Sequence, residues 1–393
     1  TDLSNVRMKW QLLANGQVVA EGVQEELNAK PGQTVQVSLP GYQIPTSAKG
    51  KEVLLNVDYS YKNDVPLLPK GYSIAFDQMT VSPYTFAQLP PSYPEPDKKS
   101  PRTEKDERLS WITLTAGKTS VTFGRQEGWI DYIDVDGQPM LQKGYSLKPD
   151  FWRAPTDNDY GAGLQNHFKA WRNTPMNLKK FDCKPVGNAM QVIAEYDLPS
   201  VSAHLTMTYT LQADGQLVVN QKLNVDSSAK NRPSLFRYGM QLCMPKAYNT
   251  IEYYGKGPGE NYIDRNHGDR LGVYKQAVAD QYWGYIRPQE SGNKTQVRYW
   301  NVTNTQGHGL SFYSTAPMEC SSLNYLTEDL DDGPDKYLHQ SHSGDLTPRD
   351  LTAVHIAQRQ MGLGCIDSWG AWPRPEYMIP YQNYDFTFVI KPL

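Results

Sequence analysis

Residues 151–163 of the chain read Phe-Trp-Arg-Ala-Pro-Thr-Asp-Asn-Asp-Tyr-Gly-Ala-Gly. The Asp157-Asn158-Asp159 run followed by Gly161 is typical of a turn, because short Asx side chains bond their own backbone and glycine accepts positive φ. On its own, such a cluster indicates an ordinary surface turn. The adjacent Phe151-Trp152 pair and Arg153 favour a different interpretation, in which aromatic rings anchor the loop in a core and its polar end contacts a ligand.

Length and charge limit what can surround this loop. With 393 residues the chain exceeds the size of a single hydrophobic core, so we expect two or more domains. The net charge is −3 with acidic and basic residues interspersed, which indicates neither a nucleic-acid surface nor a face for anionic membranes. No apolar run approaches membrane-spanning length and no targeting segment is readable, so no compartment is assigned. The expected partner is a neutral small molecule or a protein.

Aromatic residues favour a sugar among such partners. The 26 Tyr and 9 Trp exceed what packing needs, and rings with a polar edge are common stacking platforms for the C–H faces of sugars. The four cysteines are far apart and form no C-x-x-C pair, which argues against a zinc site and against a dense disulfide scaffold. Free buried thiols are therefore expected at Cys183, Cys243, Cys320 and Cys365.

Residues 1–88 predict a small immunoglobulin- or fibronectin-like β-sandwich. The alternation of apolar and polar residues over Met8–Ala20, interrupted by Asn15-Gly16, predicts a hairpin with a type I′ turn. Further strands are predicted at Thr34–Leu39, Val53–Tyr61 and Gly71–Val81. Residues 89–106 are rich in proline and charge, cannot support a core, and are predicted to form a linker.

Residues 107–393 predict a second, larger all-β domain. Its expected strands are Trp111–Thr115, Ser120–Arg125, Trp129–Val135, Met190–Tyr196, Ser202–Gln212, Gln216–Val225, Ser234–Met244, Asn249–Gly255, Thr295–Asn301, Gly309–Tyr313 and Tyr384–Ile390. Short helices are expected at Gln165–Trp171 and Ser321–Leu326. So much antiparallel β-structure exceeds one ordinary sandwich, so we predict two large facing sheets, a supersandwich.

Two polar loops in this domain either present their polar side chains to a ligand or hold parts of the fold together. Tyr253–Arg265 has the glycines of a phosphate loop, but no Lys-Ser/Thr follows and no helix opens behind it. Ile286–Lys294 is a polar turn before a strong strand. Both are interpreted as structural loops that join parts of the fold.

Histidines and acidic residues give weaker signals. The run Glu328–Gly333 lacks the final Glu of an EF-hand calcium loop, and the His339/His342 pair follows it. We predict a solvated surface there, with weak cation binding as the lesser alternative. A Gly-x-Ser-x-Gly nucleophile elbow is absent.

A last candidate lies at Arg359–Pro373. The glycine-rich backbone around Asp367-Ser368-Trp369 does not suit a regular strand, so Trp369 is either presented at a loop surface or packed in the core. An exposed Trp beside a carboxylate suits a hexose. The ring would take the apolar face of the sugar, while Asp367 would take a hydroxyl or hold the loop.

Together these stretches resemble one family. Phe151–Gly163, Tyr253–Arg265, Tyr285–Arg298 and Arg359–Trp369 are similar, in this order, to the C-terminal domain of glycoside hydrolase family two β-galactosidases. Residues 1 to about 85 resemble the immunoglobulin-like domain that precedes it. The resemblance implies a C-terminal fragment of a β-galactosidase whose larger domain has the galactose-mutarotase-like supersandwich fold.

The resemblance also implies what this chain lacks. In this family a Glu acid/base and a Glu nucleophile, both in a (β/α)₈ barrel, carry out a retaining hydrolysis of terminal β-D-galactosides. No alternating βα pattern of that length occurs here. We therefore expect no catalytic residue, no metal ligand and no bound cofactor in this chain, because the family's Mg²⁺ and Na⁺ belong to the missing catalytic domain. The isolated chain is expected to be inactive. Its expected partners are the galactoside, the missing N-terminal and barrel domains, and further copies in a homo-oligomer.

Five residues are candidates for the substrate side of the site. Trp369 matches the family's sugar-stacking ring, and the segment around Gly161 matches its mobile loop, whose glycines would allow movement. The other candidates are Asp157, Asn158 and Asp367. Cys365-Ile366 stands where many relatives have Gly-Asp, and Trp372 offers a second ring that could stack instead of Trp369.

Two other functions are compatible with the same fold. A free-standing aldose 1-epimerase would need a His/Glu acid-base pair across a sugar, and none of the seven His has a suggestive sequence context. A carbohydrate-binding module would need useful sugar affinity in this chain alone.

Overall fold

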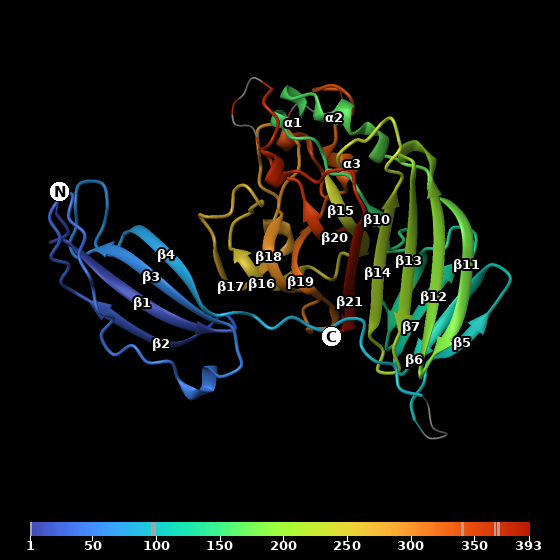
Figure 1. Cartoon of the computed structure of the whole chain (residues 1–393), viewed down its shortest axis with the longest axis horizontal. Helices are drawn as coiled ribbons and strands as arrows, with labels where there is room; N and C mark the ends of the chain where they lie inside the picture. Colours follow the sequence, from blue (N-terminus) through green and yellow to red (C-terminus); the bar gives the residue numbers. More distant parts are fainter. Residues whose placement is uncertain (1, 96–99, 339–341, 365–366, 368–369) are drawn as a thin grey trace. The chain divides into compact units, whose positions relative to one another are not determined.

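The computed structural model describes residues 2–95, 100–338, 342–364, 367 and 370–393. These residues form two compact units, Thr1–Phe86 with Arg270–Val273, and Ala87–Asp269 with Tyr274–Leu393. Antiparallel strands dominate both units (Figure 1), which confirms the all-β fold class. No helix among the described residues is long and apolar enough to cross a membrane.

The first unit is built on a four-stranded sheet of order β2-β1-β3-β4, formed by β1 (Val6–Ala14), β2 (Gln17–Gln24), β3 (Val53–Tyr61) and β4 (Ser73–Ser82). The predicted hairpin is confirmed. Asn15 and Gly16 have φ of 45° and 80°, the two positive values that a type I′ turn needs. The predicted strand at Thr34–Leu39 is wrong, because residues 25–45 cross the unit without strand pairing. Only Leu27 and Leu39 of that segment join the core, and Val35 and Val37 are exposed.

One face of β1 supplies most of this core. Val6, Met8, Trp10 and Leu12 alternate with outward residues and are at most 4 % exposed. A β-carbon at Gly22 on the neighbouring strand would lie 2.6 Å from Nε1 of Trp10. The glycine therefore makes room for the largest ring of the core.

The second unit contains a twelve-stranded and a five-stranded sheet. The five-stranded sheet consists of β5 (Glu104–Glu107), β6 (Trp111–Ala116), β7 (Thr119–Gly124), β8 (Ile130–Val135) and β9 (Gln138–Pro139). The larger sheet consists of β10 (Lys148–Asp150), β11 (Asn177–Val186), β12 (Ala189–Leu198), β13 (Ala203–Leu211), β14 (Leu217–Val225), β15 (Arg237–Pro245), β16 (Thr250–Gly257), β17 (Arg270–Ala277), β18 (Lys294–Thr303), β19 (Gly309–Leu323), β20 (Leu351–Gln360) and β21 (Tyr384–Pro392).

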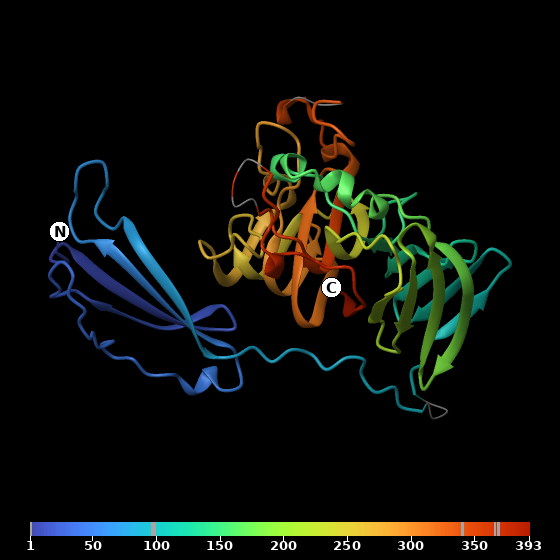
Figure 2. The ribbon, with the colours of Figure 1, turned by 45° about the horizontal axis from the view of Figure 1, so that its top comes forward.

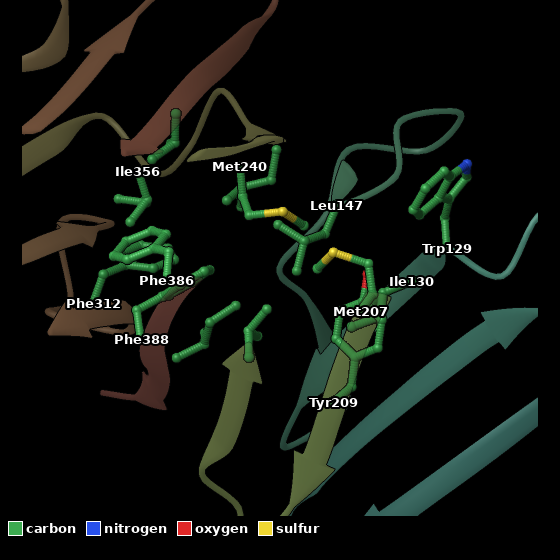
Figure 3. Close-up of a cluster of buried hydrophobic side chains, with 14 of the residues drawn as sticks. Trp129, Ile130, Leu147, Met207, Tyr209, Met240, Phe312, Ile356, Phe386 and Phe388 are labelled. Carbon is green, nitrogen blue, oxygen red and sulfur yellow. The ribbon is translucent and has the colours of Figure 1, made fainter. Parts of the chain in front are cut away.

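The five-stranded sheet lies against β11–β14, as Figures 1 and 2 show from two directions. Side chains from both sheets close one continuous core between them. Phe123 of β7 packs edge-on against Tyr209 of β13, with ring centroids 5.3 Å apart. Figure 3 shows Met207 and Tyr209 facing Ile130 in this core, which continues to Phe386 and Phe388 of β21. This is the facing-sheet arrangement that the sequence predicted.

The helices are short and cluster in loops: α1 (Asp157–Gly161), α2 (Leu164–His167) and α3 (Thr327–Leu330). The helix predicted at Gln165–Trp171 is confirmed as α2 with the following 3-10 turn Lys169–Trp171. The helix predicted at Ser321–Leu326 is wrong, because β19 continues to Leu323. Ser322 is fully buried there and its hydroxyl accepts a hydrogen bond from Trp300 Nε1 at 3.0 Å.

Strands β5, β9, β10, β11, β17 and β20 lie outside the predicted ones. β11 contains Lys179-Lys180 and is the edge strand of its sheet, so its exposed charges obscure the alternation. β5 begins inside the predicted linker and pairs with β6. Of the cysteines, Cys243 and Cys320 are free and buried as predicted, Cys183 is free but half-buried, and Cys365 lies outside the described residues.

Candidate functional site

The candidate site is a group of loops at one end of the second unit, where α1 and α2 meet the segment after β20 (Figures 1 and 2). The Phe151–Gly163 stretch enters this end from β10. Phe151 and Trp152 are buried, and Trp152 Nε1 donates to Asp331 at 2.8 Å. The predicted aromatic anchor of the loop is confirmed.

Arg153 fixes the loop from inside. Its guanidinium is fully buried, donates to both oxygens of Asp159 at 2.9 and 3.1 Å, and donates to the carbonyl oxygens of Met361 and Gly362. Charge-assisted bonds in such an environment are strong and directional. Arg153 therefore joins the 151–163 loop to the segment that follows β20.

A capping box then starts α1. The hydroxyl of Thr156 accepts from the backbone N–H of Asp159 at 3.1 Å, and the Asp159 carboxylate accepts from the Thr156 N–H at 2.8 Å. Both carboxylate oxygens of Asp159 are therefore used in contacts within the protein, with Arg153 and with the Thr156 N–H. The predicted turn is a one-turn helix that presents Asp157 and Asn158.

Asp157 is the half-exposed carboxylate of this helix. It accepts from Arg287 Nε at 3.2 Å, Gln289 Nε2 at 3.1 Å and Lys336 Nζ at 3.0 Å. Partial burial alone would raise its pKa, but the bonds from Lys336, Gln289 and Arg287 outweigh burial and lower the pKa below the ordinary value. Asp157 is therefore a fixed anionic acceptor that still reaches solvent.

The segment after β20 is held against these loops by one aspartate. Asp264 accepts the backbone N–H of Leu363 at 3.1 Å and that of Gly364. A β-carbon at Gly362 would lie 2.6 Å from Asp264 Cγ. Asn158 Nδ2 completes the contact by donating to the Gly364 carbonyl at 3.4 Å.

The structure brings Gly161 next to the residue that follows Trp369. Gly370 has φ of +98°, and a β-carbon there would lie 3.0 Å from the carbonyl oxygen of Gly161. Asp367 is exposed and accepts from the backbone N–H of Ala371 at 3.3 Å. Trp369 lies outside the described residues, as do its neighbours 365, 366 and 368.

Trp372, the second candidate ring, is partly buried beside α2. It is 39 % exposed and packs edge-on against His167 and Phe168, with centroids 5.2 and 5.6 Å away. Stacking of a sugar on Trp369, or on Trp372 instead, stays a prediction.

The two loops interpreted as structural are joined through Glu260. Its carboxylate accepts from Arg265 at 2.7 Å, the Gly292 N–H at 2.8 Å, Ser291 at 3.3 Å and the hydroxyl of Tyr285. The neighbouring Asn261 carbonyl accepts from Asn293 Nδ2 at 3.0 Å. These bonds support the structural interpretation of Tyr253–Arg265 and Ile286–Lys294.

Sequence reasoning missed a buried charge network beneath the loops. Arg237 of β15 donates to Asp150 at 2.6 Å, to Glu290 at 3.3 Å and to Gln360 at 2.8 Å. His355 Nδ1 lies 2.7 Å from the same Asp150 oxygen. No spacing in the sequence links these residues, because they come from separate strands and one loop.

The pKa values of two buried carboxyls at this end are shifted in opposite directions. Burial alone would raise the pKa of Asp150, but Arg237 and His355 outweigh burial and hold it well below its usual value. Glu319 lies nearby with Asn293 Nδ2 as a donor at 3.1 Å, and burial raises its pKa to about 7. Asp150 is therefore a stable anion, whereas Glu319 is close to half protonated at neutral pH.

The prediction of a solvated acidic surface at Glu328–Gly333 is wrong for Asp331 and Asp332. Both are buried: Asp331 accepts from Trp152 and pairs with Arg172 at 2.9 Å, while Asp332 pairs with Arg287 at 3.2 Å. Over the described ranges, no group of three or more His, Cys, Asp or Glu could hold a metal ion.

Comparison with known proteins gives this arrangement a family. The family described as "Beta galactosidase small chain" matches residues 115–390, and that described as "Beta-galactosidase, domain 4" matches residues 1–82.

Individual relatives agree. The β-galactosidase of Priestia megaterium is 30% identical over 399 residues, covering 100% of this chain and 36% of that protein. That of Lactobacillus delbrueckii subsp. bulgaricus is 29% identical over 398 residues, covering 100% of this chain and 37% of its own length. A galactose 1-epimerase from Lactobacillus acidophilus NCFM covers 75% of this chain and 99% of its own, with 11% identity and a TM-score of 0.38, too low to carry an argument.

The chain thus spans about a third of the length of the curated relatives it matches. The family match covers residues 115–390, more than half of the chain. The chain therefore belongs to the β-galactosidase small-chain family.

Proposed function

We propose that this chain is the C-terminal part of a retaining β-galactosidase of glycoside hydrolase family two, and that its loops complete the galactose site. The catalytic carboxylates and the Mg²⁺ and Na⁺ sites would lie in a (β/α)₈ barrel formed by the part of the enzyme that these residues do not include. Two facts support this division: the chain matches its relatives along its whole length, and it spans only about a third of theirs.

The observation that carries the proposal is the contact of the two predicted substrate loops. Gly161 and Gly370 come from segments about two hundred residues apart, yet they are adjacent in space. Trp369 is covalently next to Gly370. A ring at position 369 would thus act beside the 157–163 helix and loop, where Asp157 offers its anionic oxygens to sugar hydroxyls.

The buried carboxylates of this end favour a supporting role over catalysis. Glu260 and Glu290 are each held by an arginine, and Glu260 is held by three further donors. A retaining glycosidase needs two carboxyls facing one sugar, about 5 Å apart. Groups that bind the protein's own cations are poor candidates for that role.

Four exposed apolar side chains on two neighbouring loops indicate where the rest of the enzyme would pack. Trp283, Ile286, Tyr337 and Leu338 are 62, 85, 64 and 51 % exposed. Their two loops meet at Asp332, which pairs with Arg287 and accepts the backbone N–H of Tyr337 at 2.8 Å. Large exposed apolar groups gathered beside a site are typical of a covered surface. We assign them to contact with the catalytic part of the enzyme.

The test is a β-galactosidase assay with a chromogenic galactoside. It compares this chain alone with the longest protein that its source gene encodes, each with and without Trp369→Ala. We expect turnover only in the long protein, and a loss there on Trp369→Ala. Turnover by the 393-residue chain itself would overturn the proposal, since it would require a catalytic carboxyl pair within these residues.

The aldose epimerase alternative needs an accessible histidine. His355 is 7 % exposed and is bound to Asp150 and Arg237, so it is not available for acid-base work on a sugar.

A further inference from the structure

A second feature of the larger unit is not used by the proposed function. A cleft of about 790 Å³ opens between β10, β15 and the loops around residues 127–129, 144–146 and 171–176. Its lining includes Trp129, Tyr145, Trp171, Asn173, Thr174 and Gln241. We call it the Trp129 cleft. Its volume is in the range of small-molecule sites.

The walls of the Trp129 cleft are rigid and aromatic. Trp129 stacks on Tyr196 with ring centroids 4.4 Å apart and planes 8° from parallel. Trp171 packs on Phe151 and donates its indole N–H to the Pro233 carbonyl at 2.9 Å. Both rings are therefore held in place, and the indole N–H of Trp171 is satisfied. At 8 and 2 % exposure, Trp129 and Trp171 form a rigid apolar base of the cleft.

Three polar side chains of the cleft, in contrast, lack side-chain partners among the described residues. The buried hydroxyl of Thr174 has no hydrogen-bond partner among the described residues. Within the same ranges the structure gives no side-chain partner to Asn173, which is exposed, or to Gln241, which is half-buried. An unpaired buried hydroxyl is costly, so a ligand or water that bonds it is expected.

The charges of the cleft favour a neutral ligand. Arg172 is paired with Asp331 at 2.9 Å, and Asp150 with Arg237 at 2.6 Å. The other charged residues of the lining are Lys148, Glu127 and Glu328. A phosphorylated or otherwise anionic ligand would meet a slightly acidic lining, whereas hydroxyl groups would find amide and hydroxyl partners.

We infer that the Trp129 cleft is a second carbohydrate-binding site, which takes a neutral glycoside through Gln241, Asn173 and Thr174 against fixed aromatic walls. It is separate from the proposed galactose site, because Asp157, Gly161 and Gly370 are not part of its lining. The inference stands whether or not the chain completes a galactosidase site.

The test is ligand-detected NMR and titration of the whole 393-residue chain with methyl β-D-galactopyranoside and methyl β-D-glucopyranoside. Removing one side-chain amide that hydrogen-bonds the glycoside weakens the affinity for it by about five- to tenfold. We expect saturable binding of at least one glycoside, weakened by that factor in Asn173→Ala and in Gln241→Ala. Asn231→Ala, an exposed loop asparagine outside the lining, should bind like the parent chain.

Two further arms make the result decisive. The binding that Asn173→Ala and Gln241→Ala weaken should persist in Trp369→Ala, since its loss there would place that sugar at the candidate loops and overturn the inference. Glucose 6-phosphate should bind more weakly than the neutral glycosides, and tighter binding would overturn the neutral class. Absence of saturable binding by both glycosides, or unchanged binding in the Asn173→Ala and Gln241→Ala variants, would also overturn it.

Discussion

The carbonyl oxygen of Gly161 faces Gly370 so closely that a β-carbon at position 370 would lie 3.0 Å from it. Gly370 also has φ of +98°, a conformation that L side chains rarely adopt. Space and backbone conformation thus both require glycine at the point where the two predicted substrate loops touch.

Gly370→Ala should therefore move the loop that carries Trp369. In the complete enzyme we expect kcat/KM for a chromogenic galactoside to fall by about tenfold or more, because misplacing a substrate contact is costly. Stability should fall by only about 1 kcal/mol, since the loop is peripheral. Gly268→Ala is the matched control, because nothing lies within 4 Å of its β-carbon position and its φ is not positive. Equal activity of the two variants would contradict the proposed role.

Asp157→Asn should raise KM more than it lowers kcat. The change keeps the shape of the side chain but removes the charge that Arg287 and Lys336 face. Because Asp157 is half-exposed, we expect a stability loss below about 1 kcal/mol. Steady-state kinetics of the complete enzyme check this, with Asp335→Asn as the control from an exposed position nearby. An unchanged KM would contradict a role of Asp157 in substrate binding.

Arg237→Met should destabilise the second unit strongly. The substitution leaves Asp150 and Glu290 buried without their cation, and breaking a buried pair typically costs about 3–5 kcal/mol. Urea unfolding of the chain measures the loss. Arg108→Met removes an arginine from an exposed ion pair and should cost less than about 1 kcal/mol. Similar values for both variants would show that the network contributes little.

Glu319 should make stability depend on pH. Its pKa is about 7 in the fold against 4.5 for an ordinary glutamate, so the folded state binds the extra proton between these values. Stability therefore falls as pH rises from about 4.5 to 7, and the full loss, on the order of 3 kcal/mol, persists above pH 7. Glu319→Gln should abolish this contribution. Unfolding of both proteins at pH 5 and pH 8 measures it, and a constant difference between them would disprove it.

Much of the fold could be predicted from local sequence patterns. The Asn15-Gly16 hairpin and the strands of β12, β13 and β14 were predictable because apolar alternation and turn chemistry are local properties. Residues 34–39 and 321–326 were predicted wrongly, because tertiary contacts decided their conformation. Val35 is exposed and lies outside any strand. Ser322 belongs to β19, where it is buried against Trp300.

The candidate site, too, could be predicted only where its signal is local in the sequence. The aromatic anchor of Phe151-Trp152 was readable, because adjacent rings before an Asx-rich turn carry a local signal. The Arg237 network and the burial of Asp331 were not, since each joins residues that are distant in sequence. Only the folded sheet brings their charges together.

Arg237 has a consequence for how such a site can change over time. The guanidinium holds β10, β20 and the Glu290 loop from below, so the bases of the substrate-side loops are set by the sheet and not by their tips. Residues near the ends of these loops, such as Asp157 and Trp372, can then be substituted without disturbing the sheet and the Arg237 contacts below them. Under the proposed function, a few substitutions at these tips would change the sugar preference, whereas a change at position 237 would destabilise the sheet that supports them.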